Sequence, residues 1–184
     1  RRSDKVMMIG ISIDSLDREN NLKIGRKQGS HTLDYEQLKE VLHYIKSKGI
    51  ILKVNTVVSK LNIKEDITKL YNEVEFDRIK LLQVRIQENC NEKARPTEID
   101  STEFDEYVSK LSSKMNNSIV IESTDSIESS YVIIDPKGNL ISNSNQIHAR
   151  AGNILEESLD NLIIKAKLNI DKFLPYFLHL LSLI

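Results

Sequence analysis

Cysteine is nearly missing from this sequence: Cys90 is the only one among 184 residues. One thiol forms neither an internal disulfide framework nor a multi-cysteine metal site within the chain, so we predict no metal ligands here. Cys90 itself is most simply a surface or half-buried free thiol. The four histidines show no metal-ligand spacing among themselves. Such cysteine usage fits a reduced compartment, and we expect a cytoplasmic protein.

An excess of charge of one sign is also missing. The chain has 26 Lys and Arg against 27 Asp and Glu, a formal net charge of −1, so bulk charge gives no reason to expect a nucleic acid or membrane surface as a partner. No signal peptide or membrane-spanning run is visible. The longest apolar stretch, Phe173–Ile184, is interrupted by Pro175, His179 and Ser182 and is too short to cross a bilayer.

The chain has no initiator methionine. It begins Arg1-Arg2-Ser3-Asp4 and is at once in a predicted strand, so we expect a piece of a longer polypeptide. The length corresponds to one domain, or one and a half, and suffices for a real hydrophobic core.

Polar residues interrupt one face of the strand predicted over Ile50–Ser59. Ile51, Lys53, Asn55 and Val57 share that face, and the residues between them share a mostly apolar face that can pack under a helix. A strand covered on both sides should be apolar on both. Either Lys53 reaches solvent or pairs with a carboxylate, or this face lines a cavity in which Lys53 and Asn55 hold an anion.

Hydrophobic periodicity predicts alternating strands and helices in the first two thirds of the chain. Further strands are expected over Val6–Asp14, Arg78–Ile86 and Ser118–Ser123. Helices are expected over Asp34–Lys48, over Lys64–Glu73 with Asn62 as a possible cap, and over Glu103–Asn116 with Ser101 or Thr102 as the cap. The β-α-β-α-β order with tight loops predicts right-handed crossovers and a parallel sheet with helices outside.

The last third of the sequence has a different pattern. Asp135-Pro136-Lys137-Gly138-Asn139 is a strong turn signal and predicts a hairpin between Ser130–Ile134 and Leu140–Ser142. Asn143–Gly152 shows no regular pattern. Ile154–Lys167 is predicted as a helix whose inner stripe comprises Leu155, Leu159, Leu162, Ile163 and Ala166.

Leu16–Ser30 is predicted as a loop with a basic centre. Lys23, Arg26 and Lys27 stand around two glycines there; glycines let a backbone approach a phosphate, and cations neutralise it. The pattern lacks the GK[ST] ending of a P-loop, so a solvated basic turn is the alternative. Asp14, just before this loop, could pair with Asp17 or Glu19 as two carboxylates for acid–base chemistry, although a strand-end hydrogen bond is the simpler role.

Several segments together resemble one family. IGISIDSLD, LKIGRKQG, LKVNTVVSKLNIKED, DRIKLLQVRIQENCNE and IESTDSIESSYVIIDPKGNLI occur in order between Met8 and Phe173. They look like the second half of viperin, a family of antiviral radical S-adenosylmethionine enzymes. The KxN strand followed by an N-x-x-E-D segment is the most specific part of this resemblance.

The resemblance implies a fold and a reaction. Viperins fold as a partial (β/α)6 barrel, so we expect α/β architecture here: a partial TIM-like half-barrel of about three β/α units over 1–117, with a C-terminal extension over 118–184 on the same core. Viperins hold a [4Fe-4S] cluster through a CxxxCxxC loop and cleave S-adenosylmethionine to a radical. That radical takes a hydrogen from the ribose of CTP, UTP or GTP, and the product is a 3′-deoxy-3′,4′-didehydro nucleotide that terminates viral RNA.

The resemblance also assigns roles to particular residues. Lys53 and Asn55 match a strand pair that contacts nucleotide phosphates. Arg26 and Lys80 match cations near the triphosphate or S-adenosylmethionine. Ser12 and Ser15 match serines beside S-adenosylmethionine, and the catalytic candidate Tyr131 matches a tyrosine close to the substrate sugar, although its hydroxyl could equally be satisfied in the core.

The sequence departs from the family pattern because the CxxxCxxC loop is absent. We therefore expect this chain alone to be inactive, with S-adenosylmethionine and the cluster serving the full-length parent. The alternative is a non-catalytic α/β module that binds a nucleotide or another anion. Because half a barrel leaves Val6–Asp14 as an exposed sheet edge, we also expect self-association, strand swapping or cover by the C-terminal tail.

Overall fold

The computed structural model describes residues 6–88, 90–115, 119–144 and 147–172. The chain divides into two compact units. The first comprises Arg1–Val84 with Thr97–Glu122, and the second comprises Arg85–Pro96 with Ser123–Ile184. Each unit is described separately below.

A parallel sheet of four strands forms the centre of the first unit. Its strands β1 (Met8–Ser12), β2 (Ile51–Val58), β3 (Arg78–Gln83) and β4 (Ile119–Glu122) pair in chain order. This confirms the predicted α/β class and the parallel pairing. The sheet is open within the described residues, since β1 and β4 each pair with one neighbour there.

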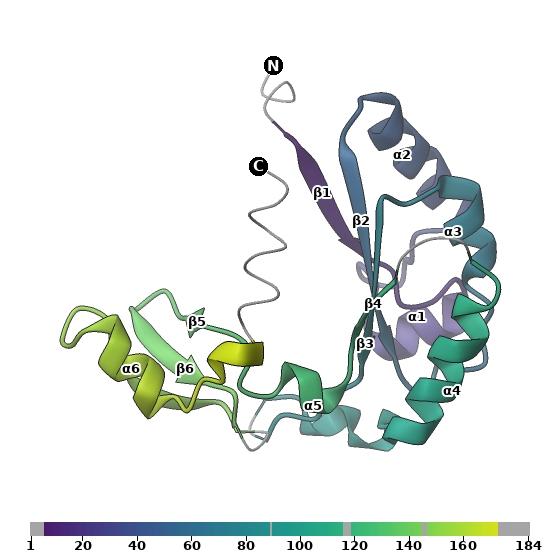
Figure 1. The fold of residues 1–184 in the computed structure, drawn as a ribbon. Helices are drawn as coiled ribbons and strands as arrows, with labels where there is room; N and C mark the ends of the chain where they lie inside the picture. Colours follow the sequence, from purple (N-terminus) through teal and green to yellow (C-terminus); the bar gives the residue numbers. More distant parts are fainter. Residues whose placement is uncertain (1–5, 89, 116–118, 145–146, 173–184) are drawn as a thin grey trace. The chain divides into compact units, whose positions relative to one another are not determined.

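The helices of the first unit cover one side of this sheet. Right-handed crossovers between strands that follow one another in the sheet place every connecting helix on the same face, and Figure 1 shows this arrangement. The helices are α1 (Arg18–Ile24), α2 (Tyr35–Ser47), α3 (Thr68–Val74) and α4 (Ser101–Ser112). The main core lies between the helices and the sheet and contains Leu42, Leu52, Val54, Leu70, Leu81 and Phe104.

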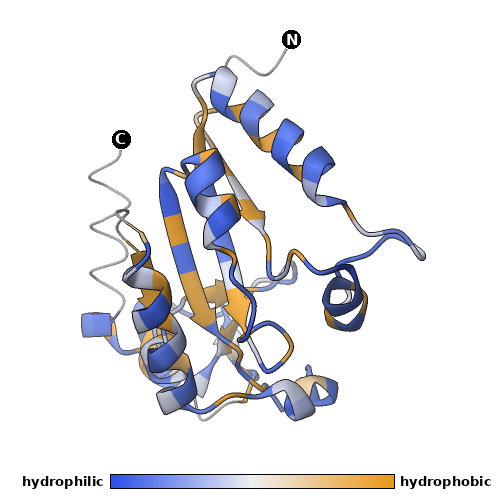
Figure 2. Ribbon diagram, turned by 90° about the vertical axis from the view of Figure 1, so that its right-hand side faces the viewer, coloured by the Kyte–Doolittle hydropathy of each residue, from blue (hydrophilic) through white to orange (hydrophobic). Residues whose placement is uncertain are grey.

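The two faces of β2 differ as the sequence predicts. Burial alternates strictly along the strand, with Leu52, Val54, Thr56 and Val58 buried under the helices and the intervening residues half-buried. Figure 2 shows the corresponding bands of hydrophobic and hydrophilic residues on the sheet. The helix-free side therefore carries the polar half of the pattern, and we call it the open face.

The prediction of a loop over Leu16–Ser30 is wrong in part, because α1 lies inside it. The Asp17 side chain accepts a hydrogen bond from the Asn20 N–H at 2.8 Å and caps the helix, which ends at Gly25 in the left-handed region with φ 91°. This helix has no fully buried residue. Hydrophobic periodicity therefore could not reveal it, and the cap was the available signal.

Two helices of the first unit begin at other residues than expected. α3 begins at Thr68, and Asn62 does not cap it; its side chain accepts from the Ser59 N–H and donates to the Asp14 and Val57 carbonyls. α4 is capped by Asp100, whose side chain accepts from the Glu103 N–H while the Glu103 carboxylate accepts from the Asp100 N–H.

The second unit contains an antiparallel sheet of β5 (Ile133–Ile134), β6 (Asn139–Ser142) and β7 (Ala149–Asn153). The predicted hairpin is confirmed, and its turn is fixed by Asp135 Oδ1, which accepts from the Lys137 and Asn139 N–H groups. β7 lies in the stretch predicted as irregular. A Cβ added to Gly152 would lie 2.4 Å from Leu162 Cδ2, so the close approach of β7 to the following helix requires glycine.

The remaining elements of the second unit are η2 (Glu92–Thr97, which extends one residue into the first unit), α5 (Thr124–Ile127) and α6 (Leu159–Lys165). α6 is shorter than the predicted helix. Of the predicted stripe, Leu162 and Ala166 are buried, whereas Leu155 is 85% exposed. The apolar tail Phe173–Ile184 lies outside the described residues. Among the residues that are described, no helix has the length and apolar character needed to cross a bilayer.

A carboxylate links the loop before α3 to the end of α4. Asp66 Oδ2 lies 2.5 Å from Lys114 Nζ, and this ammonium, followed by the Thr68 hydroxyl, lowers the pKa of Asp66 from 3.8 to about 2. A depressed folded-state pKa stabilises the fold above the unfolded value and loses this effect as pH falls through the folded value. We therefore expect the stability difference between the wild type and Asp66→Asn to shrink between pH 5 and pH 2.

Urea denaturation at pH 5, 3.5 and 2.5 measures this difference. Asp105→Asn, at an exposed position of α4, is the matched control for the removal of one carboxylate. A stability difference between the wild type and Asp66→Asn that stays constant from pH 5 to pH 2.5 would contradict the lowered pKa of Asp66.

Candidate functional site

Three cations and an amide come together on the open face. Lys53 of β2 pairs in register with Arg78 of β3, and Asn55 pairs with Lys80. Side chains at paired positions of a parallel sheet project from the same face, so all four side chains lie on the side without helices. The sequence predicted Lys53, Asn55 and Lys80 for one site. Arg78 was missed, although the R-x-K alternation within β3 was the signal for it.

Lys53 and Asn55 each have a polar group without a partner among the described residues. In the part of the chain that the structure describes, Lys53 makes no ion pair, and Asn55 Oδ1 is buried without a hydrogen-bond partner. Burial lowers the pKa of the Lys53 ammonium, and the nearby charges of Lys80 and Arg78 lower it further, against the opposing effect of Glu122. An anion on this face would relieve the electrostatic cost at Lys53, whereas Asn55 Oδ1 is an acceptor and needs a donor group, such as a hydroxyl, from a ligand.

Lys80 is held differently from Lys53. It forms an ion pair with Glu122 at the end of β4, where Glu122 is fully buried and the Lys80 side chain is 14% exposed. Glu122 shares the open face because its register partner, Leu82, is two residues beyond Lys80 on β3. The open face therefore combines three cations with one buried carboxylate, a pairing that the local sequence pattern did not indicate.

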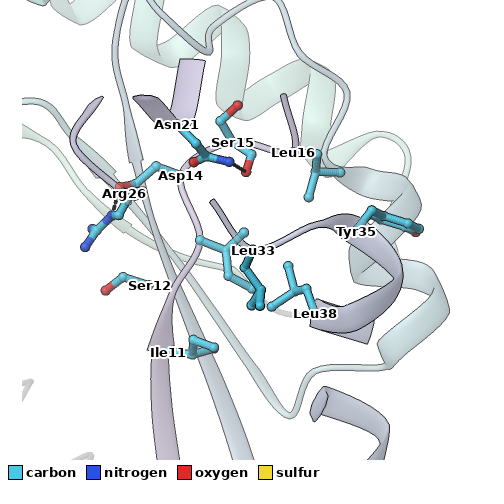
Figure 3. Close-up of a pocket in the computed structure, with 11 residues that line it drawn as sticks. Ile11, Ser12, Asp14, Ser15, Leu16, Asn21, Arg26, Leu33, Tyr35 and Leu38 are labelled. Carbon is cyan, nitrogen blue, oxygen red and sulfur yellow. Dashed lines mark hydrogen bonds and ion pairs between the residues drawn. The ribbon is translucent and has the colours of Figure 1, made fainter. Parts of the chain in front are cut away.

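A second group of predicted residues surrounds a pocket of about 100 Å³ at the end of β1. Ser12 is exposed there, and Arg26 donates from Nε to Asp14 Oδ2 at 2.6 Å. In Figure 3, Arg26 and Ser12 lie on one side of β1 and the residues that follow it, and the apolar lining residues Leu33 and Leu38 lie on the other side. The structure thus places Ser12 and Arg26 at the same pocket, and their role beside S-adenosylmethionine stays a prediction.

Ser15 lines the same pocket, but its hydroxyl is hydrogen-bonded within the protein. It is buried, and its hydroxyl donates to Glu65 at 2.6 Å and accepts from the Asp17 N–H. Glu65 also accepts from the Leu16 N–H at 3.0 Å and from Asn20. The N-x-x-E-D segment therefore has a physical role, since its Asn62 and Glu65 hold the connection between β1 and α1 in place.

Asp14 forms a hydrogen bond at the strand ends, which is the simpler of the two roles considered for it. Its Oδ1 accepts from the Val57 N–H at 2.9 Å and joins the ends of β1 and β2, while Oδ2 receives Arg26. Asp17, one of the two acids considered as its partner, instead caps α1. A carboxylate pair for acid–base chemistry does not form between them.

Tyr131 and Cys90 belong to the second unit. Tyr131 is half-buried, and its role beside a sugar stays a prediction. Cys90 is exposed, with Sγ 3.5 Å from His148 Nδ1.

An iron–sulfur cluster is ligated by several thiolates, and the sequence has one cysteine. Among the described residues, no group of three or more His, Cys, Asp and Glu side chains is placed to hold a metal ion. The residues of this chain therefore do not fit a [4Fe-4S] cluster.

Comparison with known proteins gives a consistent set of relatives. The chain is 35% identical over 170 residues to a protein of Lacinutrix mariniflava and 30% identical over 167 residues to one of Flammeovirga pacifica, both named S-adenosylmethionine-dependent nucleotide dehydratase. A fish relative from Siniperca chuatsi, with the same name followed by RSAD2, is 31% identical over 140 residues. No protein-family model matches the chain.

These alignments cover most of the chain but only part of each relative. The two bacterial matches each include 90% of this chain, and they include 35% and 57% of the respective relatives. The chain thus spans about half the length, or less, of these curated proteins. It is a relative of the S-adenosylmethionine-dependent nucleotide dehydratases, the viperin-like radical S-adenosylmethionine family that its motifs resemble.

Proposed function

We propose that this chain carries the substrate-facing part of an enzyme that dehydrates a nucleoside triphosphate with S-adenosylmethionine as its second small-molecule partner. The names of the relatives support a nucleotide substrate and a dependence on S-adenosylmethionine. The observation that carries the proposal is the open face, where Lys53, Arg78 and Lys80 stand beside Asn55. A triphosphate has about four negative charges, and cations on rigid strands bind it with little reorganisation.

In this proposal the two groups of residues bind different ligands. Lys53, Asn55, Arg78 and Lys80 face the triphosphate, while Arg26, Ser12 and the buried Ser15 surround S-adenosylmethionine. The reaction is of the lyase type and converts CTP, UTP or GTP to the 3′-deoxy-3′,4′-didehydro nucleotide. Such a product blocks extension of viral RNA, which would make the parent protein antiviral.

The proposed fold places this face inside a barrel. The four strands with helices on one side correspond to consecutive β/α units of a partial TIM-like barrel, whose interior is the open face. An incomplete barrel leaves the outer edge of β1 available for pairing, so self-association of this chain remains our expectation.

The chemistry of S-adenosylmethionine cleavage needs a cluster that this chain does not fit. We therefore propose that the chain alone binds its ligands but does not turn them over, and that the full-length parent in the cytoplasm supplies the cluster. The single cysteine also favours the second candidate, a non-catalytic nucleotide-binding module. Product formation by the cluster-loaded parent would separate the two candidates, because the binding module forms none.

Calorimetry on this chain tests the binding part of the proposal. CTP, UTP and GTP should bind, and cytidine, which lacks the phosphates, should bind at least about tenfold more weakly because it makes no charge-assisted contact. Equal affinities for CTP and cytidine, or no binding of any nucleotide even by the longer parent, would contradict the phosphate assignment.

A further inference from the structure

Arg26 occupies a position in which an arginine is ordinarily mobile. It follows directly after Gly25, the residue that ends α1, and its side chain is 45% exposed. An unrestrained arginine loses rotamer entropy when a ligand immobilises it. In this chain the side chain is restrained before any ligand binds, because Asp14 Oδ2 accepts from Arg26 Nε at 2.6 Å.

Asp14 is itself rigidly held. The side chain is 3% exposed, and Oδ1 accepts from the Val57 N–H on the neighbouring strand. Its carbonyl accepts from the Asn62 side chain, which also donates to the Val57 carbonyl. The carboxylate that restrains Arg26 is therefore built into the joined ends of β1 and β2.

The remaining nitrogens of Arg26 are available. Only Nε of its guanidinium is bonded within the described residues, so Nη1 and Nη2 have no partner there. A guanidinium presents two parallel donors to a carboxylate or a phosphate. The exposed Ser12, at the carboxyl end of β1, lines the same pocket, and Figure 3 shows Asp14 joined to Arg26 by a dashed line.

We propose that Asp14 is a positioning residue, which orients Arg26 so that its Nη edge binds an oxyanion of the ligand. The inference rests on the proposed function for the source of the oxyanion, which is the carboxylate of S-adenosylmethionine or a phosphate of the nucleotide. It goes beyond that function by assigning a role to a residue that does not touch the ligand.

The first test needs no ligand. In the wild-type chain, the Arg26 Nε–H resonance should exchange slowly with water because the proton is bonded to Asp14. In Asp14→Asn, the amide can still accept from Val57 but presents an N–H₂ group to Arg26, so exchange should become at least about tenfold faster. Asp17→Asn, a matched change in the α1 cap, should leave this exchange unchanged. Equal exchange in wild type and Asp14→Asn would overturn the positioning role.

The second test is a double-mutant cycle on ligand binding. For either S-adenosylmethionine or CTP, Asp14→Asn and Arg26→Gln should each weaken binding by about tenfold, and the double variant should bind no worse than Arg26→Gln alone. The ligand that responds identifies the source of the oxyanion. Additive losses would overturn the inference, since they would mean that Asp14 does not act through Arg26.

A third variant covers the case in which Asp14→Asn loosens β1 from β2. Arg26→Lys leaves the bond between Asp14 and Val57 intact and keeps the positive charge, but it removes the two-pronged donor. It should weaken binding of the same ligand by about tenfold, whereas full affinity would overturn the inference. If neither ligand binds the wild type, the proposed function and the oxyanion role are both wrong; slow Nε–H exchange would then show that the contact is purely structural.

Discussion

Replacing Lys53 by methionine is expected to weaken binding of CTP, UTP or GTP by about 10- to 100-fold, the effect of losing a charge-assisted contact worth about 1.5–3 kcal/mol. Methionine has a similar length without the charge. Lys53 stands next to Arg78 and Asn55 on the open face. Its loss therefore removes one of three cations from the proposed triphosphate site while leaving the helix-covered core unchanged.

The same substitution should stabilise the ligand-free chain. Burial, followed by repulsion from Lys80, lowers the pKa of Lys53, which means that the fold disfavours the charged ammonium. A lysine with a depressed folded-state pKa costs stability below that pKa, and this cost disappears as pH rises toward the unfolded value. The advantage of Lys53→Met over the wild type should accordingly be present at pH 7 and shrink as the pH rises toward the unfolded value of 10.5.

Calorimetry and thermal denaturation on the same samples measure both effects. Lys64→Met, at an exposed position, is the matched control and should change neither. A variant that loses both affinity and stability would indicate that Lys53 is a structural residue, which would contradict the proposed role.

Replacing Glu122 by glutamine is expected to destabilise the chain by about 3 kcal/mol, as is typical when one partner of a buried ion pair is removed. Glu122 is fully buried and pairs with Lys80, which is mostly buried. Removing the carboxylate takes away the counter-charge that the end of β4 presents to the Lys80 ammonium on β3. It also leaves Lys53 without the one neighbour that favours its charged form.

Urea denaturation of three variants tests this explanation. Lys80→Met combined with Glu122→Leu should recover most of the lost stability, because a well-packed apolar pair commonly replaces a buried ion pair without loss. Glu106→Gln, the same change at an exposed position of α4, should shift stability by less than about 0.5 kcal/mol. A loss of stability in Glu122→Gln no larger than that in Glu106→Gln would contradict the stabilising role of the ion pair.

Local patterns predicted much of the fold. The alternation along β2 is enough to identify the face with Lys53 and Asn55, because a strand has a side-chain period of two. α1 was missed because it buries little and depends on the Asp17 cap. β7 was missed because its sequence, ARAGN, has no hydrophobic alternation and is ordered by pairing with β6.

The candidate site was harder to predict, since it depends on contacts between distant segments. The register between β2 and β3 places Arg78 beside Lys53, and the register between β3 and β4 brings Glu122 to the open face. Neither register can be read from local sequence. Ser15 shows the reverse problem: its position beside the pocket was predicted, whereas its hydrogen bond to the distant Glu65 was not.

A titration of the isotope-labelled chain with CTP, followed by NMR, shows whether the open face binds the triphosphate. We expect the resonances of the Asn55 side-chain amide and of the Lys53, Arg78 and Lys80 backbone amides to shift together in one saturable transition with CTP, and not to shift with cytidine. Shifts confined to Lys23, at the end of α1, and to Lys27 just after it, with the β2 and β3 signals unchanged, would contradict the assignment of the open face as the triphosphate site.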